Sequence, residues 1–467
     1  MFDEQSLRST IQGVVQIDRT GAVTVKDPAR LRTNVAAALA RHAIFAEKAE
    51  VRDAGRWLLR KAGEAVGITS ASILPLYRAR GRGECGGFTV PAINIRTLTY
   101  DVARAACRAA KKLDASAVVF EIARSEIRYT EQRPPEYSAA VIAAAIREDF
   151  RGPLFIQGDH FQVSASAYYK GDREKELAAL RALIEEALAA GFLNIDIDSS
   201  TLVVLERPTL DEQQVDNCRI AAELTAHVHK HAPAGVKISI GGEIGEVGGK
   251  NSTVEELRAY MRGYRKHLDE IAPGSEGISK ISVQTGTSHG GIPLPDGTVA
   301  KVAVDFDTLR ELSIIARKEY GMAGAVQHGA STLPEDLFGK FPEVETAEIH
   351  LATGFQNLIY DHPQFPRELR DAMYAHLAKA HADERKPGMS DQQFYYKTRK
   401  QALGPFKRQM WDLPTSVREA LGADLERTFD NIFTRLRIQG TRAVVDKFVK
   451  PTPTAPRLAE HLAAILA

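Results

Sequence analysis

The sequence predicts an α/β protein with a (β/α)8 TIM barrel in its centre and a helical extension at each end. From about residue 85 onwards, short apolar runs alternate with amphipathic helical stretches, which is typical of parallel strands joined by crossover helices. Eight such runs lie within about 85–360, which matches the strand number and size of this barrel. An open doubly wound sheet is the alternative, but the segment after its first strand (93–106) lacks the expected glycine fingerprint.

The predicted strands are apolar runs bounded by glycine, proline or polar residues. They are 88–94, 116–122, 153–159, 193–199, 236–243, 279–286, 324–329 and 346–352. Helical stretches lie between them, such as 172–191, where four apolar side chains share one face: Leu177, Leu180, Ile184 and Leu188. Gly191 follows in the position of a C-cap glycine, so we expect this helix to end there.

The extensions are predicted from helical periodicity outside the barrel. We expect an N-terminal helical extension over 1–84, a barrel over 85–362 and a C-terminal helical extension over 363–467. The C-terminal part contains an aromatic and basic stretch, DQQFYYKTRKQALGPFKRQMW (391–411). We expect its aromatic face to pack on the barrel or on a second subunit, so a homo-oligomer, a dimer or larger, is expected.

Composition narrows the classes of partner and compartment. Lys plus Arg is 61 and Asp plus Glu is 60, and this balance argues against a nucleic-acid or anionic-membrane partner. The three cysteines (Cys85, Cys107 and Cys218) are widely spaced and form no CxxC pattern, so no disulfide framework is expected. No signal peptide or membrane-spanning run is recognisable. These features predict a cytoplasmic enzyme or binding protein.

Chemically active side chains follow several of the predicted strands, at the end of the barrel where active sites lie. They are Asp159-His160 after the third strand, Asp198 after the fourth, Glu243 after the fifth, His289 after the sixth, His328 after the seventh, and His350 with Thr353 after the eighth. Neighbours in an ideal strand point to opposite faces. We therefore expect the third strand to end at Asp159-His160, so that both side chains reach the barrel mouth.

Three histidines and a glutamate at one mouth predict a metal site. Imidazoles with a carboxylate suit zinc or a similar divalent ion with an open coordination position. The predicted ligands are His160, His289, His328 and Glu243. Asp159 is then placed for acid–base chemistry rather than for ligation.

Glycines and hydroxyls near the late strands predict a phosphate cradle. Gly290 and Gly329 leave backbone N–H groups accessible, and Ser331 and Thr353 supply hydroxyls. The alternative interpretation of any single histidine is a hydrogen-bonded structural residue. The tract HVHKH (227–231) resembles a metal tract, but we interpret it as a solvated helix end, because helical positions two apart do not face each other.

Several of these motifs, in this order over about 85–355, resemble the class II, metal-dependent fructose-bisphosphate aldolase family. They are GGFTVPAIN (86–94), LFIQGDHFQ (154–162), AGFLNIDIDSS (190–200), GGEIGEVGG (241–249), TGTSHGG (285–291) and VQHGAST (326–332). The resemblance implies a catalytic zinc and reversible cleavage of fructose 1,6-bisphosphate to dihydroxyacetone phosphate and glyceraldehyde 3-phosphate, in glycolysis and gluconeogenesis.

The resemblance also implies a role for each predicted site residue. His160, His289 and His328 would bind the metal, and Glu243 would lie in its neighbourhood. Asp159 would move the proton of the C4 hydroxyl, while the zinc would stabilise the enediolate. Substrate contacts would come from Asn94, Gly290, Gly329, Ser331 and Thr353. A monovalent cation would assist the phosphate site, and the expected partner is a small phosphorylated sugar.

The sequence departs from this family at two places. Where the family's eighth strand reads like NVDT, this chain has His350-Leu351-Ala352-Thr353, and Lys250 and Asn251 stand where acidic loop residues are expected. The C-terminal stretch also resembles the helper-type subunit of tagatose-bisphosphate aldolase. The alternatives are therefore a non-catalytic stabilising subunit, an aldolase for another ketose phosphate, or a different metal enzyme such as a hydrolase.

Overall fold

The computed structural model describes residues 2–245, 250–286, 304–331 and 333–466, and it confirms the predicted (β/α)8 barrel. The eight barrel strands are β4 (Val90–Asn94), β5 (Val119–Ala123), β6 (Gly152–Gln162), β7 (Asn194–Asp198), β8 (Ser239–Glu243), β9 (Lys280–Ser282), β10 (Ala325–Gln327) and β11 (Glu348–Leu351). All neighbours pair in parallel, and β11 pairs with β4, which closes the barrel.

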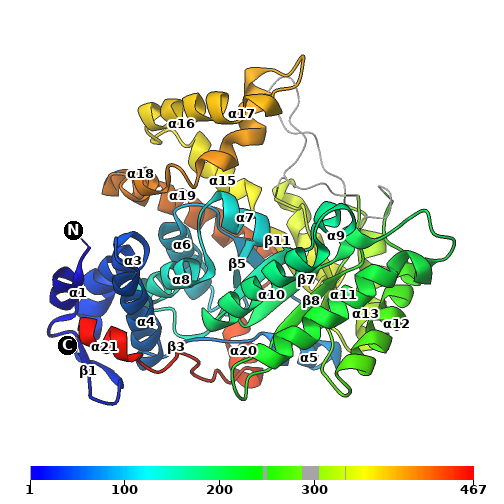
Figure 1. Ribbon diagram of the computed structural model, residues 1–467, viewed down its shortest axis with the longest axis horizontal. Helices are drawn as coiled ribbons and strands as arrows, with labels where there is room; N and C mark the ends of the chain where they lie inside the picture. Colours follow the sequence, from blue (N-terminus) through cyan, green and yellow to red (C-terminus); the bar gives the residue numbers. More distant parts are fainter. Residues whose placement is uncertain (1, 246–249, 287–303, 332, 467) are drawn as a thin grey trace.

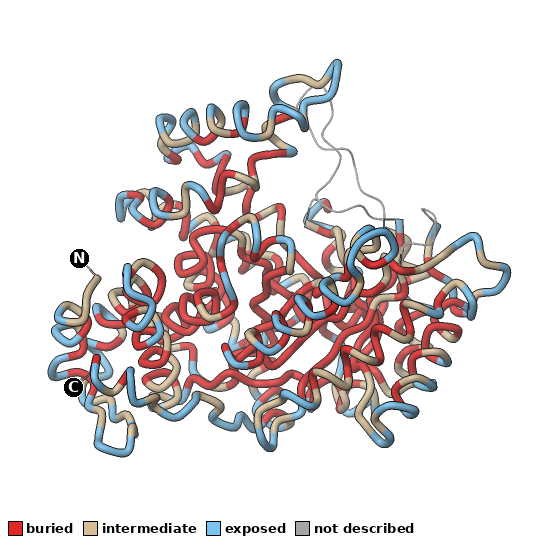
Figure 2. Tube along the Cα trace, viewed as in Figure 1, coloured by how far each residue is buried: buried red, intermediate tan, exposed pale blue. Residues whose placement is uncertain are grey.

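Helices surround the barrel on its outside (Figure 1). They are α6 (Thr99–Lys112), α7 (Arg124–Tyr129), α8 (Pro134–Glu148), α9 (Ala165–Lys170), α10 (Arg173–Ala189), α11 (Leu210–His231), α12 (Val254–Ile271), α13 (Phe306–Tyr320), α14 (Lys340–Glu343) and α15 (Thr353–Asp361). In α10, Asp172 caps the first turn and the predicted apolar face is buried. Gly191 has φ +89°, as a C-cap glycine should. Figure 2 shows the barrel strands and inner helix faces as the most buried parts.

The expectation that the third strand ends at Asp159-His160 is wrong. β6 continues to Gln162, and its pairing with β7 shifts register between Gly158 and Phe161, which marks a β-bulge. His160 lies within the bulge at φ +39°. A bulge adds a residue to one strand and re-aims the side chains beside it. This irregularity, rather than a strand end, brings both neighbouring side chains to the barrel mouth.

Gly158 makes room for this bulge. A Cβ at this position would lie 2.5 Å from the ring of Phe161, which folds back over the glycine. A side chain there would displace the aromatic ring from the core, where Phe161 is fully buried. We infer that the bulge and the glycine before it form one local unit.

The N-terminal extension is built mainly of helices, as predicted. They are α1 (Glu4–Ile11), α2 (Pro28–Arg30), α3 (Ala36–Phe45), α4 (Ala49–Ala65) and α5 (Leu74–Gly81). Helical periodicity did not predict the short hairpin of β1 (Val15–Ile17) and β2 (Val23–Val25), or β3 (Ile68–Ser70). β3 pairs in parallel with the start of β6, so this extension is attached to the barrel sheet.

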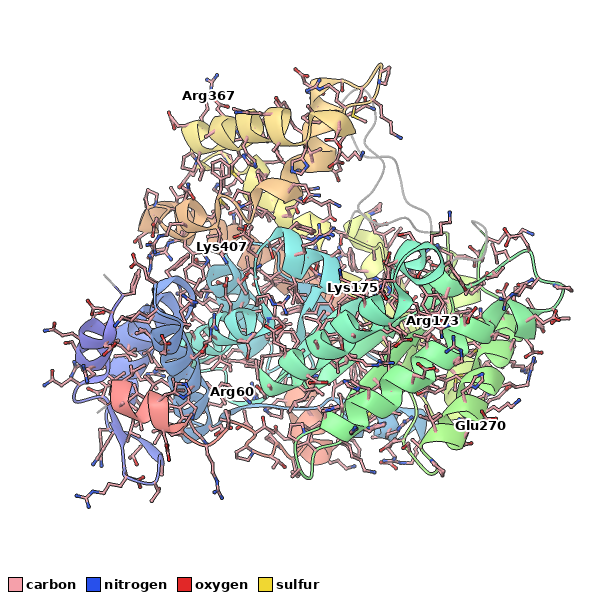
Figure 3. The ribbon with its side chains drawn as sticks, viewed as in Figure 1. Arg60, Arg173, Lys175, Glu270, Arg367 and Lys407 are labelled. Carbon is pink, nitrogen blue, oxygen red and sulfur yellow. The ribbon has the colours of Figure 1, made fainter. Side chains whose placement is uncertain are left out.

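The C-terminal extension is helical, as predicted, and returns to the barrel. Its helices are α16 (Arg367–Ala380), α17 (Asp391–Thr398), α18 (Lys407–Trp411), α19 (Thr415–Arg435), α20 (Thr441–Phe448) and α21 (Glu460–Leu466). Trp411 stacks on Tyr100 of α6, with ring centroids 6.1 Å apart. Lys407, labelled in Figure 3, forms an ion pair with Glu136 of α8 at 2.9 Å. The aromatic and basic stretch therefore packs on the barrel helices, while the domain boundaries at 84/85 and 362/363 stay predictions.

All three cysteines are free thiols. Among the described residues, none of the helices combines the length and the apolar character that a membrane crossing requires.

Candidate active site

Two histidines and a glutamate meet at the mouth of the barrel. His160 comes from the bulge of β6, Glu243 from the end of β8 and His328 from the residue after β10. His160 Nδ1 lies 2.7 Å from Glu243 Oε1, and the two imidazole rings are 4.2 Å apart. One ligand atom from each of the three residues lies within 4.8 Å of the others. The structure therefore brings three predicted ligands together.

The fourth predicted ligand, His289, lies outside the described residues, and so does Gly290 of the predicted phosphate cradle.

Asn251, in the loop after β8, donates a hydrogen bond to Asp305 at 2.7 Å. Asp305 caps the first turn of α13. Asn251, one of the two residues that depart from the family's pattern, is thus tied to the start of α13.

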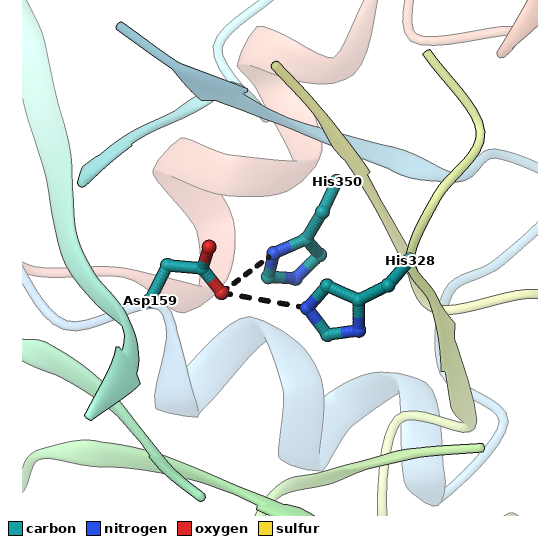
Figure 4. A group of neighbouring side chains, drawn as sticks. All are labelled: Asp159, His328 and His350. Carbon is teal, nitrogen blue, oxygen red and sulfur yellow. Dashed lines mark hydrogen bonds and ion pairs between the residues drawn. The ribbon is translucent and has the colours of Figure 1, made fainter. Parts of the chain in front are cut away.

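Asp159 lies between two imidazoles (Figure 4). Its Oδ1 is 3.4 Å from His328 Nε2 and 3.2 Å from His350 Nδ1. Burial raises the pKa of the Asp159 carboxyl, but the charges of His160 and His350 outweigh burial and hold this pKa well below its usual range. Asp159 is therefore a carboxylate at neutral pH, which is the form that can accept a proton.

His328 is held in the neutral form. Burial lowers the pKa of its imidazole well below the usual value, and the charges of His350 and His160 lower it further. Its Nδ1 lies 2.8 Å from the hydroxyl oxygen of Ser282, which fixes the ring orientation. A neutral imidazole with one nitrogen engaged by a protein group is the state that binds a metal through the other nitrogen.

Glu243 shares His160 with a second carboxylate. His160 Nδ1 lies 3.1 Å from Asp198 Oδ2, at the end of β7. Burial and then the charge of Asp198 raise the pKa of Glu243 to about 7. Burial lowers the pKa of His160, but Asp159 and Glu243 outweigh burial and raise it well above the usual value. Three carboxylates, those of Asp159, Asp198 and Glu243, therefore lie around His160, and such a group of carboxylates favours a cation.

Below the mouth, the barrel interior contains a buried charged network that the sequence analysis did not predict. Lys280 Nζ lies 2.8 Å from Asp196 Oδ2 and also forms an ion pair with Glu348. His350 Nε2 lies 2.7 Å from Glu348 Oε1, and its Nδ1 lies 3.1 Å from Glu121 Oε1. A charged residue inside an otherwise apolar strand run, as in SAVVFEI and TAEIHLA, is the signal that points to such a network.

The network is continuous with the site and fits closely around its members. Burial raises the pKa of Glu121 to about 7, and the charge of Asp159 adds to this effect. A Cβ on Gly241 would lie 2.3 Å from Asp196 Oδ1 and 2.9 Å from Lys280 Cε, so a side chain there would collide with the ion pair. Gly241 thus leaves space in the barrel interior for the ion pair between Lys280 and Asp196.

The described substrate-binding candidates lie on the same side of the barrel as Asp159. Asn94 Nδ2 donates hydrogen bonds to Glu126 at 2.6 Å and to Asp159 at 3.4 Å. Gly329 follows His328 at φ +71°. The Ser331 hydroxyl accepts the N–H of Ala352 at 2.7 Å, and the Thr353 hydroxyl accepts Arg96 Nη1 at 3.3 Å.

Two cavities meet at the imidazoles. One, of about 420 Å³, is lined by residues that include His160, Asp198, Glu243 and His328. The other, of about 860 Å³, is lined by residues that include Asn94, Arg96, Asp159, His350, Thr353 and Lys400. His160 and His328 line both cavities, so the three-ligand cluster stands where the two join. A reactant in the larger cavity would face both Asp159 and the cluster.

The residues present fit a divalent metal. Two imidazoles and a carboxylate are the ligand set of zinc sites that keep an open coordination position. Glu243 Oε1 is buried and directed at His160, another predicted ligand, so a carboxylate oxygen points into the cluster. The ion pair between this oxygen and His160 would be exchanged for metal coordination.

The family model of fructose-bisphosphate aldolase class-II matches residues 81–411. No curated protein sequence matches the chain.

Among solved structures, the chain is similar to a protein from Coccidioides immitis assigned as a fructose-1,6-biphosphate aldolase (18% identity, 80% of this chain, 99% of that chain, TM-score 0.46). It is also similar to a Sinorhizobium meliloti protein assigned as a tagatose 6 phosphate kinase (19%, 81% and 97%, TM-score 0.49). A third is the fructose-bisphosphate aldolase of Campylobacter jejuni (17%, 77% and 92%, TM-score 0.43).

Proposed function

Since the chain belongs to the class II fructose-bisphosphate aldolase family, we propose that it is a zinc-dependent aldolase acting on a ketose phosphate. The proposed substrate is fructose 1,6-bisphosphate, cleaved reversibly to dihydroxyacetone phosphate and glyceraldehyde 3-phosphate. This reaction would place the chain in glycolysis and gluconeogenesis. The observation that carries the proposal is the position of the Asp159 carboxylate, beside three side chains that could bind a metal ion.

Asp159 supplies the proton transfer. In cleavage, the C4 hydroxyl of the ketose loses its proton as the C3–C4 bond breaks and the C4 carbonyl forms. Asp159 is ionised at neutral pH, so its carboxylate has a lone pair that can accept this proton. In condensation the same group returns the proton to the C4 oxygen. The hydrogen bond from Asn94 and the ion pair with His350 orient the carboxylate toward the cavity.

His160, Glu243 and His328 would hold the metal, and His289 would complete the predicted set. When bound, a divalent ion supplies Lewis-acid polarisation of the ketose carbonyl. The neutral His328, held by Ser282, contributes a lone pair without losing a proton.

A phosphate of the substrate would lie near the start of α15. Thr353 is the first residue of this helix, whose N-terminus favours an anion. Arg96 reaches Thr353 with Nη1 and is held by Glu126 at 2.7 Å. Lys400, from the turn after α17, lines the same cavity. Burial and then the charge of Arg96 lower the pKa of the Lys400 amine, as expected where two cations approach an anion site.

A ketose phosphate other than fructose 1,6-bisphosphate is the second candidate, and one observation favours it. His350 stands where the family has asparagine, and it is engaged by Asp159, Glu121 and Glu348. Ala352, in place of the family's aspartate, lines the cavity without a polar group. The sugar hydroxyls near these two positions would be recognised differently.

The experiment is cleavage of fructose 1,6-bisphosphate by the purified chain, with and without a chelator, with metal content read in the same sample. Activity that is lost to the chelator and restored by zinc supports the proposal. Bound zinc without cleavage favours another ketose phosphate, to be tested in the same assay. A purified chain that binds no metal and cleaves no substrate contradicts the proposal, and this result favours a stabilising subunit of another aldolase.

A further inference from the structure

The tract HVHKH ends helix α11, on the outside of the barrel, and α10 packs beside it (Figure 1). The predicted helix end is confirmed. His227 and His231 are four positions apart, so they lie on one face of α11, one turn from each other. Their rings are 4.2 Å apart. Glu185 of α10 faces both imidazoles.

The three side chains direct their ligand atoms at one point. His227 Nε2 lies 3.0 Å from Glu185 Oε1, and His231 Nε2 lies 3.7 Å from the same oxygen. One ligand atom from each residue lies within 4.8 Å of the others. Ligands about 2.1 Å from a tetrahedral ion are separated from each other by about 3.4 Å. The two observed separations lie on either side of this value.

The other nitrogen of the His231 ring is directed at a backbone carbonyl. His231 Nδ1 lies 2.9 Å from the carbonyl oxygen of His227, the residue one turn earlier. The His227 ring hydrogen-bonds the backbone of Arg181 in α10. When Nδ1 donates to a carbonyl, the neutral ring presents an Nε2 lone pair, as in most protein metal sites. Both Nε2 atoms point to Glu185.

We propose that Glu185, His227 and His231 form a second divalent-metal site, for zinc or another ion that prefers imidazole, such as Cu²⁺ or Ni²⁺. It goes beyond the proposed aldolase activity, because none of these residues lines the two cavities at the barrel mouth. Solvent completes the coordination, since the Glu185 side chain is 49% exposed. Bound metal joins α10 to α11.

Charged neighbours leave the site open to a cation. Arg181 of α10 extends toward Glu223, with Nη2 3.8 Å from Oε2. Glu223 also forms an ion pair with Arg219 at 2.9 Å. Arg181 is thus directed at a carboxylate that is not one of the three ligands. Glu185 forms ion-pair contacts only with the two histidines within the described residues.

The test counts bound metal on the full-length chain. Metal-free protein is incubated with ZnCl2, desalted, and its zinc measured per chain, for the unaltered chain and for H231A, E185Q and H229A. H229A is the matched control, because His229 lies on the same helix but its Nε2 is 2.7 Å from the carbonyl of Glu276. We expect H231A and E185Q to hold one zinc fewer than the unaltered chain, and H229A to hold the same amount.

A metal at the barrel mouth would be counted equally in every variant, so it does not change the difference in zinc content between them. The outcome of this test is therefore separate from that of the proposed function. If H231A and E185Q retain the zinc content of the unaltered chain, the proposal is overturned. The melting temperature provides a second measurement on the same proteins. Zinc should raise it less in H231A than in H229A, and an equal rise contradicts a metal link between α10 and α11.

Discussion

His350 joins the Asp159 carboxylate to the charged interior of the barrel: its Nδ1 lies 3.2 Å from Asp159, and its Nε2 lies 2.7 Å from Glu348. Burial lowers the pKa of His350, but the carboxylates of Glu121 and Asp159 outweigh burial and raise it well above the usual value. The imidazolium therefore stabilises the ionised form of Asp159. This makes His350 a positioning residue for the proposed base.

The substitution H350N tests this role. Asparagine keeps a polar side chain but removes the positive charge, so the pKa of Asp159 should rise. We expect kcat to fall by about 10- to 100-fold, as for other residues that orient a reactive group, with the acidic limb of the pH–rate profile moved to higher pH. A fall in kcat with an unmoved profile would mean that His350 acts only by packing.

The substitution D159N tests the base itself. The amide cannot accept the C4 proton, so we expect turnover to fall by about 10²–10⁴-fold while zinc content is unchanged. H328A is the comparison variant, because it removes a predicted ligand and should lower zinc content as well. Cleavage by D159N at the native rate would place the proton transfer elsewhere.

Glu243 predicts a pH dependence of stability in the metal-free protein. Its pKa is raised by burial to about 7, against 4.5 for an ordinary glutamate, so the folded state binds the extra proton between these values. The extra proton stabilises the folded state, and this stabilisation is fully present below about pH 4.5. It is lost as the pH rises through about 7, which lowers the free energy of unfolding by about 3 kcal/mol. The melting temperature should fall over this range.

E243Q provides the control for this slope, because glutamine resembles the protonated carboxyl at every pH. We expect the melting temperature of E243Q to fall less between about pH 5 and about pH 7.5 than that of the unaltered chain. Parallel curves for the two proteins would show that Glu243 titrates normally.

Lys280 predicts a large effect of a single buried charge on stability. Its side chain is 1% exposed and forms ion pairs with Asp196 and Glu348. K280M leaves these carboxylates without their cation, which typically costs about 3–5 kcal/mol. K237M is the matched control, because Lys237 is 77% exposed and pairs with Glu276 at the surface, which is worth about 0–1 kcal/mol. Equal melting temperatures for the two variants would contradict this account.

The strand positions and most of the mouth could be predicted from the sequence, because apolar runs and strand ends are local features. Glu243 and His328 meet as expected, since parallel strands end at one face of the barrel, and Asp159 and His160 reach them through the bulge in β6. The bulge could not be predicted, because Phe161 continues the apolar pattern past the pair. The role of Lys280 was not predicted, because a single charged residue in a short strand does not show which carboxylates lie across the barrel from it.

Lys400 provides the last prediction, on substrate binding. Its Nζ lies 5.8 Å from the Tyr129 ring centroid, and within the described chain no carboxylate forms an ion pair with it. A cation in this state is available to a substrate phosphate. K400M removes a charge-assisted hydrogen bond worth about 1.5–3 kcal/mol, so kcat/KM for the phosphorylated ketose should fall by about 10- to 100-fold.

K397M is the control for this prediction, since Lys397 lies in the same extension but is exposed and pairs with Glu384 at 3.3 Å. Inhibition by inorganic phosphate gives a second measurement that does not depend on turnover. If Lys400 contacts the phosphate, phosphate should inhibit K400M more weakly than K397M, with zinc content unchanged in both. Equal inhibition of the two variants would place the phosphate away from the C-terminal extension and leave Arg96 and the start of α15 as its binding groups.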